Sequence, residues 1–425
     1  MAKIQLHWQI LIAILLAFVC GQLTGIEHSI FGVTFYSMYE FIGTMFMNAL
    51  LMIIVPLIVS SIICGVANIG GRSDLGRLGG MTLGYYILTS TLAIMVGLFY
   101  VNLLSPGIVD GVAAGASLNL SLDEATLTTA VASVEGRGGG EIAEIFLRMI
   151  PTNIVAAAAE GQMLGLIFFA LVFGYFMTQI PNRQGEVLLN FWQGISETMM
   201  RITIWVMRFA PFGVFGLVAS TVAATGFAAF QPMLIFFITV LLALGTHLFI
   251  VLPLLLKYVG GVNPSPLYKA MAPALLTAFS TSSSSATLPL TMECLEKRGG
   301  VSEKTTSFVL PLGATVNMDG TALYECVAAI FLAQAYGLEL SFVTQFTVVL
   351  IALLTSIGVA GIPAASLVAI AVILTAIGLP VEAIGLLLVT DRILDMCRTA
   401  INVFSDSSGA VIIAKRQGEL GILES

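Results

Sequence analysis

The chain has 425 residues, of which 58% are hydrophobic and only 10% are charged. A mean hydropathy of +1.01 excludes an ordinary soluble enzyme. The net charge of −7 and the absence of any basic cluster exclude a nucleic-acid-binding protein. The composition therefore predicts an all-α polytopic membrane protein.

Six apolar segments occupy the first part of the chain and predict conventional membrane helices, near residues 8–25, 36–68, 80–104, 150–180, 188–222 and 232–258. Several exceed the ~20 residues that a bilayer requires, so we expect them to be tilted. The first segment lacks a small-residue cleavage site and is interpreted as a helix, not as a signal peptide. A polar stretch from Ser105 to Arg148 predicts a loop between the third and fourth segments.

Lysine and arginine are distributed unevenly between the loops. With the N-terminus inside, 11 of the 17 basic residues lie on the cytoplasmic side, two on the external side and four within membrane segments. The positive-inside rule then predicts a multi-pass protein of the plasma (inner) membrane, with both termini cytoplasmic.

Two later segments are apolar at both ends and polar in the middle. Pro266–Glu296 carries the run Ser280–Ser285 at its centre, and Phe342–Leu379 carries Thr355–Ser366. Both flanks of the first segment carry basic residues assigned to the cytoplasmic side, so it enters and leaves the membrane by one face. Because unwound backbone at membrane depth is tolerated only where it is buried in protein or lines a cavity, each segment predicts a re-entrant hairpin beside a site.

A helix with a polar motif follows each hairpin. The first motif is Gly313–Thr321, and the second is the run Asp391–Asp406, inside an apolar segment from Val381 to Ile413. A hairpin and a helix that occur twice, entered from opposite faces, indicate an inverted repeat. We therefore expect both tips and both motifs to meet near the middle of the membrane.

The second motif places polar residues along one stripe of its helix: Asp391, Asp395, Arg398, Asn402 and Asp406. They fall within about 80° of arc and over roughly 22 Å of helix. Each charge at mid-bilayer costs roughly 2.5–3.5 kcal/mol on insertion scales. A structural ion pair needs one acid and one base, so the excess of acids predicts a site for charged ligands.

These motifs, in this order, resemble those of the dicarboxylate/amino acid:cation symporter family, and the resemblance covers nearly the whole chain. Tyr85–Ser90, Ile150–Asn153 and Gly361–Pro363 also match. The resemblance implies eight transmembrane helices plus two re-entrant hairpins, in a homotrimer that works by an elevator mechanism. It implies scaffold helices at residues 1–79 and 150–222, and a mobile transport domain at residues 80–149 and 223–425.

The resemblance also implies a substrate site. Arg398 would bind the side-chain carboxylate of an acidic amino acid, which the guanidinium fork suits bidentately, and Asp395 would pair with the ammonium group. The other residues that it implies are Ser283 and Ser284 at the first tip, Thr321, Thr399 and Asn402, with Ile362 and Pro363 at the external gate.

The charges on the two motifs require cations. Four aspartates against Arg398 leave three uncompensated negative charges, a state that a low-dielectric site tolerates only with cations bound. Oxygen ligands suit hard cations, and the resemblance identifies sodium. It implies one ion at Gly313, Asn317, Asn402 and Asp406, a second at Thr315, Ser356, Ile357 and Val359, and a third at Tyr86, Thr89, Ser90, Asn317 and Asp319. The residues alone would make Tyr86, Thr89 and Ser90 ordinary interhelical hydrogen-bonding groups.

Glu325 lies four residues after Thr321, on roughly the same helical face. Proton-coupled animal members of the family carry glutamate here, whereas archaeal sodium-coupled members carry glutamine. Low dielectric favours the neutral carboxyl, so we expect a proton as a possible second coupling ion; a permanently protonated structural donor is the alternative.

Three departures from the family pattern accompany this site. Val359 stands where archaeal members have threonine, and Ser282 and Met396 stand where archaeal and animal members, respectively, have arginine. Arg392, one turn before Met396, is a substitute for these arginines or a residue that extends toward the interface. The histidines lie in no cluster in the sequence, so a zinc-type site is not expected.

We therefore expect sodium-coupled uptake of L-glutamate or L-aspartate and no enzymatic activity. Symport of C4 dicarboxylates or of neutral amino acids is the close alternative; Asp395 disfavours the first and Arg398 the second. An intramembrane serine hydrolase would need a G-x-S-x-G elbow, which the chain lacks around Ser282–Ser285. A cation channel does not explain an arginine between the acids.

Overall fold

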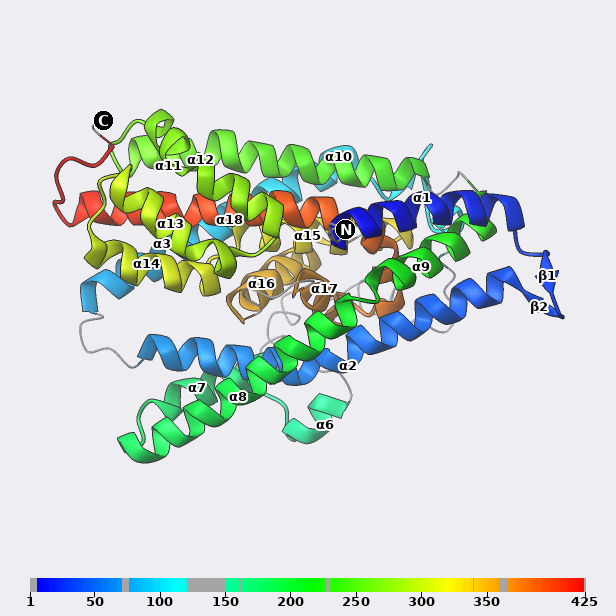
Figure 1. Cartoon of the computed structure of the whole chain (residues 1–425), viewed down its shortest axis with the longest axis horizontal. Coiled ribbons are helices and arrows are strands. Elements are labelled where there is room, and N and C mark those ends of the chain that lie inside the picture. Colours follow the sequence, from blue (N-terminus) through cyan, green and yellow to red (C-terminus); the bar gives the residue numbers. More distant parts are fainter. Residues whose placement is uncertain are drawn as a thin grey trace, which may run out of the picture.

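The structure is a computed structural model that describes residues 6–70, 76–118, 120, 150–159, 163–226, 230–338, 340–358 and 365–423. Most of these residues are helical (Figure 1). In the first half of the chain the helices are α1 (Leu6–Thr24), α2 (Phe35–Gly70), α3 (Gly76–Leu104), η1 (Ala116–Leu118), α6 (Ile154–Ala159), α7 (Met163–Met177), α8 (Asn182–Met207) and α9 (Ala210–Thr225). The only strands in this described part form two small antiparallel hairpins, β1–β2 (Ser29–Ile30, Val33–Thr34) and β3–β4 (Ile108–Val109, Val112–Ala113).

The second half of the chain is helical wherever it is described in regular structure. Its elements are α10 (Phe230–Thr246), η3 (His247–Val251), α11 (Leu252–Tyr258), α12 (Pro264–Thr281), α13 (Ser284–Lys297), α14 (Glu303–Val316), α15 (Asp319–Ala335), α16 (Phe342–Gly358), α17 (Ala365–Ala376), η4 (Val381–Ala383) and α18 (Ile384–Arg416). The predicted final membrane helix is therefore present as α18.

Several helices have the length and apolar character of membrane spans. Among the described residues these are 35–67, 78–104, 231–258 and 303–335, with α8 and α9 together forming a possible fifth. Large apolar side chains such as Leu15, Phe41 and Leu242 are exposed on the outside of the helices, as expected for a surface that faces lipid. A mostly helical protein with several membrane-length apolar helices is confirmed; the eight spans and the re-entrant hairpins stay predictions.

One predicted span is divided within the described residues. The apolar segment 188–222 consists of α8 and α9, which are bent by 55° relative to each other. Pro211 lies at the start of α9 and has no backbone N–H to continue α8, which explains a break at this point. The segment 150–180 consists of α6 and α7, with residues 160–162 outside the described part.

The helices pack in two groups, with α16 and α17 between them (Figure 1). In one group α1 and α2 pack on α9, and α2 also packs on α7 and α8. In the other, α3 packs on α10 and α15, while α18 packs on α12, α14 and α15. Helix α15 is buried on nearly all sides, which its apolar residues allow.

The hydrophobic core is divided into two clusters, and the polar motifs lie where they meet. The first cluster includes Leu323 of α15 and Ile401 of α18, whereas the second includes Val316 of α14 and Phe404 of α18. The boundary between the two hydrophobic clusters lies at the interruption between α14 and α15 and at the polar part of α18. Polar groups are thus held between two apolar bodies.

The C-terminal segment after α18 folds back onto the start of α14. The Glu419 carboxylate accepts hydrogen bonds from the Ser302 amide (2.9 Å), the Ser302 hydroxyl (2.7 Å) and the Thr305 hydroxyl (2.5 Å). Partial burial raises the pKa of Glu419, but the hydrogen bonds from Thr305 and Ser302 outweigh burial and hold this pKa below its ordinary value. The carboxylate also lies at the positive end of the α14 dipole.

We predict that Glu419→Gln lowers the free energy of unfolding by about 1 kcal/mol at pH 7, since the charge-assisted hydrogen bonds are weakened. Because the folded-state pKa is lowered, this contribution is fully present above the ordinary value of 4.5 and disappears as the pH falls through the lowered pKa. The measurement is thermal unfolding of both proteins in detergent between pH 7 and pH 3.

The matched control is Glu293→Gln, which removes an exposed i,i+4 pair with Lys297 and should leave the unfolding temperature unchanged. An equal loss of stability in both variants at pH 7 would contradict the role assigned to Glu419.

Candidate functional site

The first polar motif interrupts a long helix inside the protein. Helix α14 ends at Val316 and α15 begins at Asp319; between them Asn317 is extended and Met318 is in another non-helical conformation. Asn317 and Asp319 have no exposed surface. The interruption presents backbone groups and side-chain oxygens together in the interior, which is tolerated only where they are satisfied by protein or by ligand.

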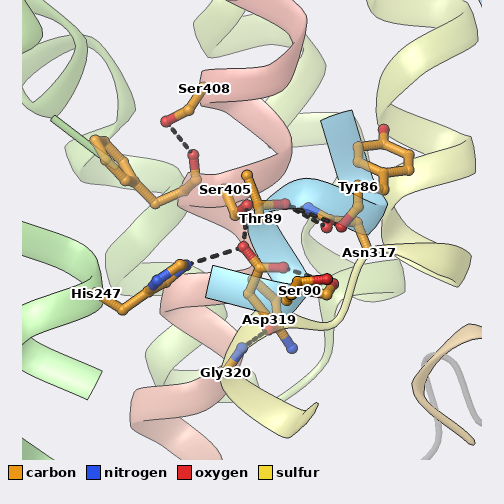
Figure 2. Close-up of polar contacts among 12 residues, drawn as sticks. Tyr86, Thr89, Ser90, His247, Asn317, Asp319, Gly320, Ser405 and Ser408 are labelled. Atoms are coloured by element: carbon orange, nitrogen blue, oxygen red, sulfur yellow. Dashed lines mark hydrogen bonds and ion pairs between the residues drawn. The ribbon is translucent and has the colours of Figure 1, made fainter. Parts of the chain in front are cut away.

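Asp319 is the centre of a hydrogen-bonded cluster shown in Figure 2. Its Oδ1 accepts from the Ser90 hydroxyl of α3 at 2.8 Å. Its Oδ2 accepts from the Ser405 hydroxyl of α18 at 2.6 Å and lies 3.0 Å from Nε2 of His247. One carboxylate therefore joins groups from α3, α15, α18 and the segment between α10 and α11.

A second carboxylate, Asp406, lies beside this cluster. Asn317 donates from Nδ2 to Asp406 at 2.9 Å and to Ser405 at 3.0 Å, and its Oδ1 accepts from Thr89 at 3.3 Å. Gly313 faces the same place: a Cβ built there would overlap the Asp406 carboxylate and lie 2.7 Å from the Tyr86 hydroxyl. The absence of a side chain at 313 is thus what allows these oxygens to gather.

The oxygen-rich cluster fits the ligand preference of a hard monovalent cation. The atoms that could bind a cation are carboxylate, amide and hydroxyl oxygens. They are not the thiolates or several imidazoles that a transition metal prefers. The structure brings together the residues of two predicted sodium sites, namely Gly313, Asn317 and Asp406 for the first, and Thr89, Ser90, Asn317 and Asp319 for the third. Tyr86 is adjacent, but its hydroxyl donates to the Val309 carbonyl at 2.7 Å.

Arg398 is the charged centre of α18 on the N-terminal side of this cluster. Its side chain is 1% exposed, and Nη2 donates to Asp391 at 2.9 Å and to Asp395 at 3.0 Å. The guanidinium lies over the ring of Tyr324, 3.9 Å from the ring centroid. Two of its nitrogens, Nε and Nη1, have no hydrogen-bond partner among the described residues.

Asn402 connects the arginine side to the first turn of α15. Its Oδ1 accepts from the Gly320 amide at 2.8 Å, and its Nδ2 donates to the Thr321 hydroxyl at 3.2 Å. Thr399, on the next turn, donates to the Asp395 carbonyl at 2.8 Å. Asp395, Arg398, Asn402 and Thr321 of the predicted substrate site are thus linked through α15 and α18.

The hairpin tips are placed less completely. Ser282 has a left-handed conformation (φ 51°) that turns the chain from α12 into α13, and the Ser283 hydroxyl caps α13 by accepting from the Ala286 amide. Helices α12 and α13 both contact α18. In the second hairpin Ser356 and Ile357 belong to α16, whereas Val359, Ile362 and Pro363 lie outside the described residues. Thr315, from the same predicted sodium site, is exposed at the end of α14.

His247 belongs to this polar cluster, which was not predicted from the sequence. It is fully buried against Asp319, although 72 residues separate them in the sequence. Ser405 and Tyr324 were also missed, since a hydroxyl and a ring in an apolar helix carry no signal of their own. For His247 a signal existed, because an ionisable residue inside a membrane helix is costly and usually functional.

Comparison with known proteins agrees with this geometry. The sequence model described as "Sodium:dicarboxylate symporter family" matches residues 6–416 of this chain. The chain belongs to this family. The resemblance that the motifs indicated is therefore confirmed, and the buried polar cluster of α3, α14, α15 and α18 is that of a sodium:dicarboxylate symporter family member.

Several relatives match over most of their length. A proton/sodium-glutamate symport protein of Bacillus caldotenax is 36% identical over 420 residues, covering 99% of this chain and 96% of the relative. A proton/glutamate-aspartate symporter of Escherichia coli (strain K12) is 35% identical over 413 residues, covering 97% and 93%. Excitatory amino acid transporter 3 of Mus musculus is 35% identical over 449 residues, covering 96% and 85%.

We predict that Gly313→Ala destabilises the protein by about 1–3 kcal/mol and weakens its stabilisation by sodium, because the added methyl group overlaps the Asp406 carboxylate. The measurement is thermal unfolding of purified protein at increasing sodium concentration. Gly84→Ala is the control, since its Cβ meets nothing within 4 Å on the same helix as Tyr86. Equal sodium responses in the two variants would show that the cluster does not hold sodium.

Proposed function

We propose that this protein is a secondary active transporter that couples uptake of L-glutamate or L-aspartate to sodium, with no enzymatic activity. The observation that carries the proposal is Arg398, a guanidinium with 1% exposure whose Nε and Nη1 have no partner among the described residues. Buried donors without acceptors are costly, so they indicate an anionic ligand. The names of the Bacillus caldotenax and Escherichia coli relatives, which both include glutamate, support a glutamate-type substrate.

The two carboxylates on Arg398 account for the second charge of the substrate. Asp391 is 11% exposed and Asp395 is 20% exposed, so Asp395 is the more accessible partner for an ammonium group. A dicarboxylate without an amine would be repelled by Asp395, and a neutral amino acid would leave Arg398 without its carboxylate. C4 dicarboxylates or neutral amino acids remain the alternative substrates.

Sodium enters the proposal through the oxygen cluster around Asp319 and Asp406. Neither carboxylate has an arginine or lysine partner among the described residues, and both lie in the interior. Cations bound there compensate charge that the protein leaves uncompensated. The sites at Gly313, Asn317, Asn402 and Asp406, and at Tyr86, Thr89, Ser90, Asn317 and Asp319, are the ones the packing supports most directly.

The proposal includes the family architecture. It has eight transmembrane helices, re-entrant hairpins α12–α13 and α16–α17, and a homotrimer in the plasma (inner) membrane with cytoplasmic termini. The scaffold comprises residues 1–79 and 150–222, and the elevator-like transport domain comprises residues 80–149 and 223–425. Helices α1, α2 and α7–α9 pack mainly on one another, and α3, α10–α15 and α18 pack mainly among themselves, which supports this division (Figure 1).

We predict that Arg398→Ala abolishes uptake of L-glutamate and L-aspartate, since losing a buried guanidinium–carboxylate contact costs roughly 3–5 kcal/mol. Uptake of small neutral amino acids should persist or increase. Arg201→Ala, an exposed arginine on α8, is the control and should transport normally. Radiolabelled uptake into proteoliposomes measures both; unchanged aspartate affinity in Arg398→Ala would contradict the assignment.

Protons form the second part of the proposal, through Glu325. This carboxyl is fully buried on α15, one helical turn after Thr321. Low dielectric favours its neutral form while an anionic substrate is bound nearby, and its proton can leave once the substrate has dissociated. The proton-coupled relatives of Bacillus caldotenax and Escherichia coli support this role by their names.

We predict that Glu325→Gln slows net uptake and removes its pH dependence, while substrate exchange across the membrane continues, because exchange does not require the proton to leave. The measurement compares net uptake with exchange in proteoliposomes at varied internal and external pH. If the variant keeps both the rate and the pH dependence of net uptake, Glu325 is a structural donor only.

A further inference from the structure

Of the two histidines whose side chains the structure describes, His28 and His247, only His247 lies in the polar cluster. Its ring enters the cluster from η3, and Nε2 lies 3.0 Å from Oδ2 of Asp319 (Figure 2). Both side chains have no exposed surface. A contact of this kind in the membrane interior is not an incidental surface pair, because water cannot replace it.

The direction of this hydrogen bond follows from its partners. An ionised carboxylate only accepts, so Nε2 carries the hydrogen and donates it to Asp319. The other ring nitrogen, Nδ1, has no hydrogen-bond partner among the described residues. Donation from Nε2 to Asp319 is the same whether or not Nδ1 also carries a hydrogen.

The backbone around His247 is built to present this ring. Residues 247–251 form a single π-helical turn, η3, in which the Leu252 amide donates to the His247 carbonyl five residues earlier. Pro253 has no N–H, so the Leu248 carbonyl loses the partner that this register would give it. The Tyr268 hydroxyl of α12 donates to that carbonyl at 2.5 Å. Such π turns interrupt helices mostly at functional sites.

The two oxygens of Asp319 have different neighbours as a result. Oδ2 accepts from His247 and Ser405, whereas Oδ1 accepts from Ser90, which belongs to a proposed sodium site with Thr89. Two donors from different elements fix the rotation of the carboxylate about its Cβ–Cγ bond. Because Oδ2 is held in place, Oδ1 points toward α3, where the proposed sodium site lies.

We propose that His247 is a positioning residue for sodium: it donates from Nε2 to Asp319 and holds Oδ1 of that carboxylate toward the sodium ligands of α3. The inference rests on the proposed sodium coupling and adds a residue that no sodium set included. Partners that orient a metal-binding carboxylate typically contribute about 10–100-fold in metal affinity. His247 has the place and chemistry of such a partner.

The test is sodium-dependent thermal stabilisation of the purified full-length protein without amino acid, with choline chloride keeping ionic strength constant. His247→Phe keeps a ring but removes the donor, and it should raise the sodium concentration for half-maximal stabilisation about 10–100-fold. His247→Gln keeps a donor at similar reach and should lie closer to wild type than to His247→Phe. If His247→Phe does not fold, His247→Asn, whose amide is too short to reach Asp319, takes its place with the same expectation.

Thr246→Val is the matched control. It removes the part-buried hydroxyl of the residue before His247, which contacts the Tyr100 hydroxyl at 2.9 Å and not Asp319. The sodium response should therefore be unchanged. A wild-type sodium midpoint in His247→Phe, or equal losses in the Phe and Gln variants, would overturn the inference. No sodium response in the wild type would instead contradict the proposed sodium coupling itself.

Discussion

The excess of carboxylates over cationic groups in the interior is the constraint on which this structure depends. Asp319 and Asp406 lie among hydroxyls and amides, while Asp391 and Asp395 share Arg398. Taking such groups out of water is expensive, and hydrogen bonds offset only part of that cost. The interruption between α14 and α15, the small residue at Gly313 and the meeting of two hydrophobic clusters make room for compensating ions. The stability of the interior is therefore linked to what the protein binds.

Coupling between cation and substrate follows from shared elements. Asp319 begins α15, Gly320 donates to Asn402, and Thr321 receives a hydrogen bond from the same asparagine. The cation cluster and the arginine side thus meet in one helical turn. In the proposed account, sodium at Asp319 and an amino acid at Arg398 act on the same turn of α15, so by linkage each changes the affinity of the other equally. Symport needs a coupling of this kind, since each ligand alone leaves the site electrostatically unbalanced.

Charge and spacing in the sequence were sufficient to predict α18, its stripe and the first hairpin, because a polar residue inside an apolar run has few explanations. They could not place Tyr86, Thr89 and Ser90 near Asp319, which only family resemblance indicated, since hydroxyls in helices bond locally more often than not. His247 was assigned to no cluster because its partner is 72 residues away. The bend between α8 and α9 could have been predicted from Pro211. Periodicity and composition do not predict which distant elements pack against each other.

The most direct measurement of the central claim is ligand-dependent thermal stabilisation of the purified protein, with L-aspartate, L-glutamate, succinate and L-serine each added with and without sodium. An Arg398–Asp395 site that depends on cations predicts that L-aspartate or L-glutamate stabilises the protein only when sodium is present. This stabilisation should be well above the stabilisation by succinate or L-serine. Stabilisation by succinate or L-serine to the same extent, or by an acidic amino acid to the same extent in sodium-free buffer, would contradict it.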